Sequence, residues 1–241
     1  MTGGEIAATL AILALASLVQ ATAGFGFALL SMPLLSTVID PASALAITSL
    51  VSIVNSGATA LTSHGDADRT TLRRLIFAAL MGMPFGIVLL ESASIRVMQV
   101  LIAATVGASA LALGLGLRLS RAGRRTDAAA GFVSGVLGTS TGTSGPPIVI
   151  ALQSRGMPAR PMRATLSWQF AATGWVSVVL LAVRGFVDRT DVLVSIAALP
   201  ILLASWSVGA HSFGRLSQSR YERLVVLLLL AAAAVGLVHA L

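Results

Sequence analysis

The stretch between Glu5 and Asp40 decides the fold. It reads Ile6-AATLAILALASLVQATAGFGFALLSMPLLSTV-Ile39, which is 34 consecutive residues without a charge. A membrane-spanning helix needs only about 20 such residues. As one helix the stretch would extend about 51 Å, against a hydrocarbon core of about 30 Å. Gly24 and Gly26 lie within it, and glycine weakens a helix locally. We therefore expect a membrane segment that is interrupted near these glycines.

The composition of the whole chain agrees with this expectation. Its 241 residues are 56% hydrophobic and 10% charged, whereas a soluble domain carries roughly 25% charged residues. Mean hydropathy is +0.92. The apolar segments are 6–39, 42–63, 71–90, 97–117, 128–152, 164–183, 192–212 and 224–240. All eight segments are expected to be helices, because a lone strand leaves its backbone unpaired in lipid. The sequence predicts an all-α polytopic membrane protein.

The positive charge of the chain indicates contact with lipid. All 16 basic residues are arginines, the net charge is +7, and nearly all the arginines lie in short gaps between apolar segments. This distribution is typical of cytoplasmic loops that face anionic lipid. No basic stripe alternates with stacking aromatics, so a nucleic-acid partner is not expected. The chain has no cysteine, which excludes disulfides and thiolate metal sites. We expect no metal and no cofactor.

The two halves of the chain resemble each other. The shared features, in order, are an apolar segment rich in small residues (20–35 and 135–152), a proline seven residues before a threonine (Pro41 and Thr48, Pro158 and Thr165), and the motifs GDADRT at 65–70 and GFVDRT at 185–190. Three features in the same order predict a first repeat over 1–117, an arginine-rich linker over 118–127 and a second repeat over 128–241. Such a duplication is a common transporter design.

The arginine positions favour a particular path through the membrane. If all eight segments cross once, nine arginines lie inside and seven outside. If 6–39 and 128–152 each return to the side from which they entered, thirteen lie inside and three outside. The positive-inside rule favours the second arrangement. It makes the halves inverted repeats, each opening with a broken or re-entrant helix, and it places the linker in the cytoplasm.

Candidate binding groups gather in the sequence GVLGTSTGTSGPP, which runs from Gly135 to Pro147. Its glycines up to Gly138 suit close packing between helices. The five hydroxyls of 139–144, followed by two prolines that disfavour helix, are a better lining for a polar cavity. If a half-helix ends here, its amides and these hydroxyls can replace the hydration shell of an anion.

The candidate substrate-binding residues are Gln20, Gly24 and Gly26 in the first half and Thr141, Gly142, Thr143, Ser144, Gly145, Pro146 and Arg163 in the second. Arg163 begins an apolar segment and has two interpretations. It either attracts an anion into the cavity mouth or extends to lipid phosphate. Polar residues elsewhere in the segments, such as Asn55 and Gln169, either pair helices or contact a ligand.

An intramembrane serine protease is an alternative function. Gly142-Thr-Ser144-Gly145 fits the G-x-S-G of rhomboid proteases, and Ala210-His211-Ser-Phe-Gly214 fits their A-H-x-x-G. Ser144 and His211 would then form a catalytic dyad. Two prolines follow the serine where the protease needs a continuous helix, and the protease has no reason to show a duplication. We therefore favour a protein without catalytic residues. A membrane subunit of a larger complex is a third alternative.

With these residues in view, the chain resembles the TauE/SafE sulfite exporter family. The resemblance rests on GFGFALLSMPLL at 24–35, on PASALAITS at 41–49, on 135–147 and on VGAHSFGRL at 208–216. It implies a multi-pass transporter of the bacterial inner membrane that moves sulfite, sulfonates or related organic anions and is not an enzyme. No nucleotide-binding motif occurs, so a gradient is expected to drive transport, with a proton or another ion as coupling partner. Phe25 and Phe27 stand where the family has a denser glycine run.

Overall fold

The structure is a computed structural model that describes the chain apart from residues 24–25, 64, 120–121, 213–226, 228–229 and 239–241, and apart from the side chains of 22–23, 159, 206 and 209–212. Its helices are α1 (Gly3–Ala23), α2 (Phe27–Leu35), α3 (Pro41–Thr62), α4 (Arg69–Ser92), α5 (Ile95–Gly114), α6 (Arg124–Ser140), α7 (Gly145–Ser154), α8 (Ala159–Val183) and α9 (Arg189–Ser212). Residues 230–238 are also helical, and the described residues contain no strand. Among the described helices, five are long and apolar enough to cross a membrane. The predicted class, an all-α polytopic membrane protein, is confirmed.

Short polar residues begin several of the long helices. Asp40 caps α3 by accepting hydrogen bonds from the first-turn amides of Ala42 and Ser43, and Pro41 is preorganised for the first helical position. Asp68 caps α4 in the same way. The motifs GDADRT and GFVDRT therefore both precede and begin a long helix. Helix α4 begins at the arginine of the first motif, and α9 begins at the arginine of the second.

Helices α4 and α6 approach each other closely because glycines line their contact. A Cβ atom added to Gly82 would lie 2.1 Å from the carbonyl oxygen of Phe132, and one added to Gly135 would lie 2.0 Å from that of Ala79. Gly86 is as tight, with the backbone oxygen of Val136 at 2.2 Å, and at Gly131 the nearest atom is the backbone oxygen of Leu75 at 2.7 Å. Small residues allow such backbone approach between helices in membranes. The first part of the glycine stripe of α6 therefore serves helix packing.

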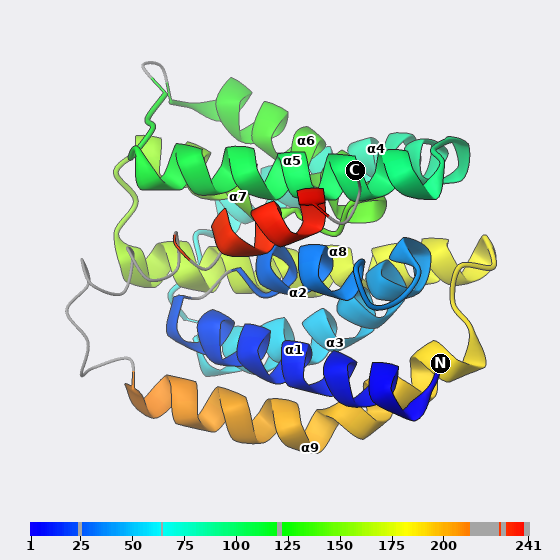
Figure 1. The fold of residues 1–241 in the computed structure, drawn as a ribbon. Coiled ribbons are helices and arrows are strands. Elements are labelled where there is room, and N and C mark those ends of the chain that lie inside the picture. The colour runs from blue at the N-terminus through cyan, green and yellow to red at the C-terminus, as the bar shows by residue number, and fades with distance from the viewer. Residues whose placement is uncertain (24–25, 64, 120–121, 213–226, 228–229, 239–241) are drawn as a thin grey trace.

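The contacts between helices match in the two halves. Exchanging α1, α3 and α4 with α6, α8 and α9 reproduces the same pairs. Helix α1 packs along α9, and α6 packs along α4. Helix α3 contacts α9, α8 contacts α4, and α3 and α8 pack against each other. The long helices run side by side along one common direction (Figure 1). Residues 230–238 lie against α2 and α5, where Gly236 is close to Pro33 and Ala103.

The molecule has two ends along this direction, and they differ in charge. One end, here called the arginine-rich end, holds residues 65–74, 118–119, 122–127 and 154–163, which include the Arg160–Asp66 and Arg155–Asp127 ion pairs. The opposite end holds residues 1–5, 36–43, 91–99 and 184–191, where Arg184 pairs with Glu91. In Figure 1 the arginine-rich end is at the left and the N-terminus is at the right.

Candidate functional site

A cavity of about 70 Å³ lies between the two interrupted segments. Its walls come from the end of α1, the start of α2, α3, α4, α6, the start of α7 and α8. The two interruptions are brought together here. Gly142 lies in the second interruption, and a Cβ on it would meet the side chain of Met32 on α2 at 2.8 Å. Gly142 has φ of 72°, a left-handed conformation that favours glycine.

Two short helices begin at this cavity. Gly26, Phe27 and residues of the following turn line it from α2, and Ser144 and Gly145 line it from α7. Neither helix has a side-chain hydrogen bond at its N-cap. The first amides of a helix have no partner within it, and its N-terminus carries about half a positive charge. The end of α2 presents the amides of Phe27, Ala28 and Leu29. The end of α7 presents the amide of Gly145, because Pro146 and Pro147 have no N–H.

Hydroxyl groups supply most of the polar lining. The residues that carry them are Thr48, Ser49, Ser52, Ser134, Thr143, Ser144, Thr173 and Ser177. Ser134 is 1% exposed and Ser177 is 5% exposed, and neither hydroxyl has a hydrogen-bond partner among the described residues. A buried hydroxyl without a partner costs about 1–3 kcal/mol, so these two groups are suited to bind a molecule that enters the cavity.

The structure brings together most of the residues that the sequence predicts as substrate-binding. Those that line the cavity are Gln20, Gly26, Gly142, Thr143, Ser144 and Gly145. Gly24 lies outside the described residues. Thr141 supports the lining without reaching it, because its hydroxyl is 2.7 Å from that of Thr143. Pro146 and Arg163 also do not line the cavity.

Arg163 contacts the end of α1. Its guanidinium donates a hydrogen bond of 3.1 Å to the backbone oxygen of Ala21, and a cation at a helix C-terminus is favourable. Arg163 thus holds α8 against the first interruption. Gln20, one residue before Ala21, donates to the hydroxyl of Ser56 on α3. These two contacts fix the end of α1 beside the cavity.

Sequence reasoning missed the cavity residues of α3, α6 and α8. Ser52, Ser134 and Ser177 are single hydroxyls in apolar segments, and nothing in their local sequence distinguishes them from serines that bond to their own helix. The one available signal is spacing, since Thr173 and Ser177 lie four residues apart and therefore on one face of α8. Which face points inward depends on how α3, α6 and α8 pack.

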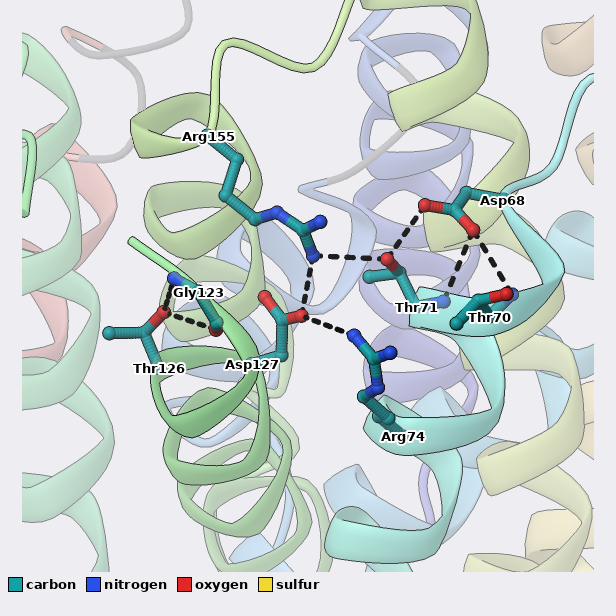
Figure 2. Close-up of polar contacts among 8 residues, drawn as sticks. All are labelled: Asp68, Thr70, Thr71, Arg74, Gly123, Thr126, Asp127 and Arg155. Atoms are coloured by element: carbon teal, nitrogen blue, oxygen red, sulfur yellow. Dashed lines mark hydrogen bonds and ion pairs between the residues drawn. The ribbon is translucent and has the colours of Figure 1, made fainter. Parts of the chain in front are cut away.

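An ion cluster at the arginine-rich end fixes the far end of α7 (Figure 2). Asp127, in the first turn of α6, is fully buried and accepts a hydrogen bond of 2.5 Å from Arg155, which directly follows α7. Arg74 of α4 lies 3.7 Å from the same carboxylate oxygen. Arg155 also donates to the hydroxyl of Thr71. Because α4, α6 and α7 all line the cavity, this cluster joins three of its walls.

Thr71 extends the cluster to Asp68. Its hydroxyl donates to the Asp68 carboxylate at 2.7 Å, and the amides of Thr70 and Thr71 donate to the other oxygen (Figure 2). The hydrogen bond from the Thr71 hydroxyl is the main cause that lowers the pKa of Asp68, and burial opposes it. The backbone amide of Asp68 bonds in turn to Thr165 of α8.

The cavity offers little support for the protease. Ser144 is the N-cap of α7 and lines the cavity. The side chain of its proposed partner, His211, lies outside the described residues. The two prolines that follow the serine occupy the first turn of α7.

Comparison with known proteins assigns the family. The family model of the sulfite exporter TauE/SafE matches residues 9–236. A search of the curated proteins and a search of the solved structures found no match. The match covers both interruptions, the cavity and the ion cluster, and nothing in it supports a rhomboid protease. The resemblance seen in the sequence is thus confirmed: the chain belongs to the TauE/SafE sulfite exporter family, a family of multi-pass membrane transporters of sulfur anions.

Proposed function

We propose that this protein is a secondary transporter that moves small sulfur oxoanions, such as sulfite or a sulfonate, across the bacterial inner membrane. The substrate is held in the cavity between the two interrupted segments. Gly26 and Ser144–Gly145 contribute helix N-termini, and Gln20 and the lining hydroxyls contribute further donors. Arg163 acts by positioning the end of α1.

The observation that carries this proposal is the meeting of two uncapped helix N-termini at one buried cavity. Backbone amides at a helix N-terminus form an anion site. In transporters with broken helices, such ends point at anionic substrate groups at the repeat interface. The family match independently supports sulfur anions as the substrate class.

The halves are proposed to be inverted repeats, 1–117 and 128–241, joined by the linker 118–127. The exchange of packing partners between α1–α9 and α6–α4 supports this proposal. Alternating access would then move one repeat against the other around the cavity. The arginine-rich end is proposed to face the cytoplasm, because cytoplasmic loops carry an excess of arginine.

Uptake by the purified protein in liposomes tests the proposal. We expect labelled sulfite and ethanesulfonate to enter proteoliposomes. Uptake measured with a proton gradient and uptake measured without one are compared to identify the coupling ion. Protein-free liposomes are the control for leakage. Flux that needs no further subunit would exclude a role limited to a larger complex. Failure of every sulfur oxoanion to enter or exchange would contradict the proposed function.

A further inference from the structure

Within the part of the chain that the structure describes, no side chain of opposite charge lines the cavity that is proposed to hold an anion. Among the described residues that line it, none is Arg, Lys, His, Asp or Glu. The nearby Arg163 bonds to the backbone oxygen of Ala21 and lies outside the lining. The positive potential at the lining therefore comes from partial charges on the N-terminal amides, which α2 supplies in full and α7 supplies only through Gly145, because Pro146 and Pro147 have no N–H.

From this uncharged lining we infer that the protein binds its substrate as a monoanion, namely bisulfite or an alkanesulfonate, and discriminates against the sulfite and sulfate dianions. The inference rests on the proposed function and adds the charge state of the substrate. The cost of removing an ion from water rises with the square of its charge, so a dianion loses about four times as much as a monoanion. The attraction between an ion and neutral dipoles rises only linearly with the charge of the ion. The lining therefore returns to a dianion only about twice the energy that it returns to a monoanion.

The unpaired hydroxyls support the same conclusion. Ser134 on α6 and Ser177 on α8 are buried, line the cavity and have no partner among the described residues. A hydroxyl donates one hydrogen bond and also accepts. Each can donate to an acceptor oxygen of bisulfite or of a sulfonate, and neither adds the net positive charge that would offset a second negative charge on the ligand.

Exchange across proteoliposomes at equal pH on both sides tests the inference without a proton gradient. Vesicles loaded with unlabelled ethanesulfonate take up labelled sulfite at a fixed total concentration between pH 6 and pH 9. Sulfite is a mixture of monoanion and dianion in this range, and ethanesulfonate is a monoanion throughout. Exchange of labelled ethanesulfonate in parallel corrects for any effect of pH on the protein.

We expect sulfite exchange, divided by ethanesulfonate exchange, to follow the bisulfite fraction. It should fall about tenfold for each pH unit above the pKa at which bisulfite ionises. Excess sulfate should compete far less than excess methanesulfonate. A ratio that stays constant or rises with pH, or equal competition by sulfate, would overturn the inference while leaving the transporter intact. Absence of exchange for every anion would overturn the proposed function itself, so the two failures are distinguishable.

Discussion

At the scale of single residues, Ser134 and Ser177 give the sharpest prediction. Each hydroxyl is buried, lines the cavity and has no partner among the described residues. Removing it by Ser134→Ala or Ser177→Ala should leave thermal stability unchanged or raised, because an unpaired buried hydroxyl is unfavourable. The half-saturation concentration for transport should rise about tenfold, since a hydrogen bond to a charged group contributes about 1.5–3 kcal/mol. Melting curves and exchange kinetics measure the two effects.

Serines that bond to their own helix provide matched controls. Ser140 of α6 donates to Val136, and Ser167 of α8 donates to Arg163. Both are buried, and neither lines the cavity. Ser140→Ala and Ser167→Ala should leave the half-saturation concentration unchanged. If they weaken transport as much as the cavity variants, the cavity serines have no special role as ligands.

A second residue-scale prediction concerns Thr71, which accepts from Arg155 and donates to Asp68. Thr71→Val should destabilise the protein by about 1–3 kcal/mol near neutral pH, because the charged groups of Asp68 and Arg155 each lose a hydrogen bond. The pKa of Asp68 is lowered in the fold, so this carboxylate stabilises the fold above its ordinary pKa, and the stabilisation is lost as the pH falls through the lowered value. In Thr71→Val the pKa of Asp68 lies closer to its ordinary value, so that loss should be smaller and complete at a higher pH.

Unfolding in detergent from pH 7 to pH 3 measures this shift. Thr70→Val is the control. Thr70 bonds to Asp68 through its backbone amide, and the substitution leaves that amide in place. Identical pH profiles for wild type and Thr71→Val would refute a dominant role of the Thr71 hydroxyl in the pKa of Asp68.

At the scale of elements, the interruptions were readable from the sequence and the pairing of α4 with α6 was not. Glycines and prolines weaken or end helices wherever they stand, so the stretches around Gly26 and Gly142–Pro147 were identifiable by local chemistry alone. Gly82 and Gly86 of α4 carry no such signal, because their role appears only when α6 lies against them. Helix α6 also begins at Arg124, inside the predicted linker, since Asp127 is stabilised there by arginines from α4 and α7.

The contact between α4 and α6 can be tested by adding single methyl groups. Gly82→Ala would place a Cβ 2.1 Å from the backbone oxygen of Phe132, so the helices must separate. Overpacking of this kind costs about 1–3 kcal/mol or more. At Gly57, within α3, a Cβ would meet nothing within 4 Å. Gly57→Ala should therefore be neutral or stabilising, by up to about 1 kcal/mol. Thermal unfolding of both variants provides the measurement, and equal stability of the two would contradict the close packing.

At the scale of the whole molecule, the fold gathers arginines from several gaps between apolar segments at one end and places others at the opposite end. Arg74, Arg155 and Arg160 meet at one end although they are up to 86 positions apart in sequence. Arg184 pairs with Glu91 at the other end. Both ends of the interrupted stretch 6–39 lie at this opposite end, because Glu5, Ile39 and Asp40 line one surface hollow.

This separation makes the orientation in the membrane a testable property. The chain has no cysteine, so Met157→Cys reports the arginine-rich end and Ser92→Cys the opposite end. Because the positive-inside rule places the arginine-rich end in the cytoplasm, an impermeant maleimide should label Met157→Cys in inverted vesicles and Ser92→Cys in intact spheroplasts. Labelling of both cysteines from one side would show that α4 does not cross the bilayer. The reverse pattern would place the arginine-rich end outside, against the positive-inside rule, and would overturn the proposed orientation.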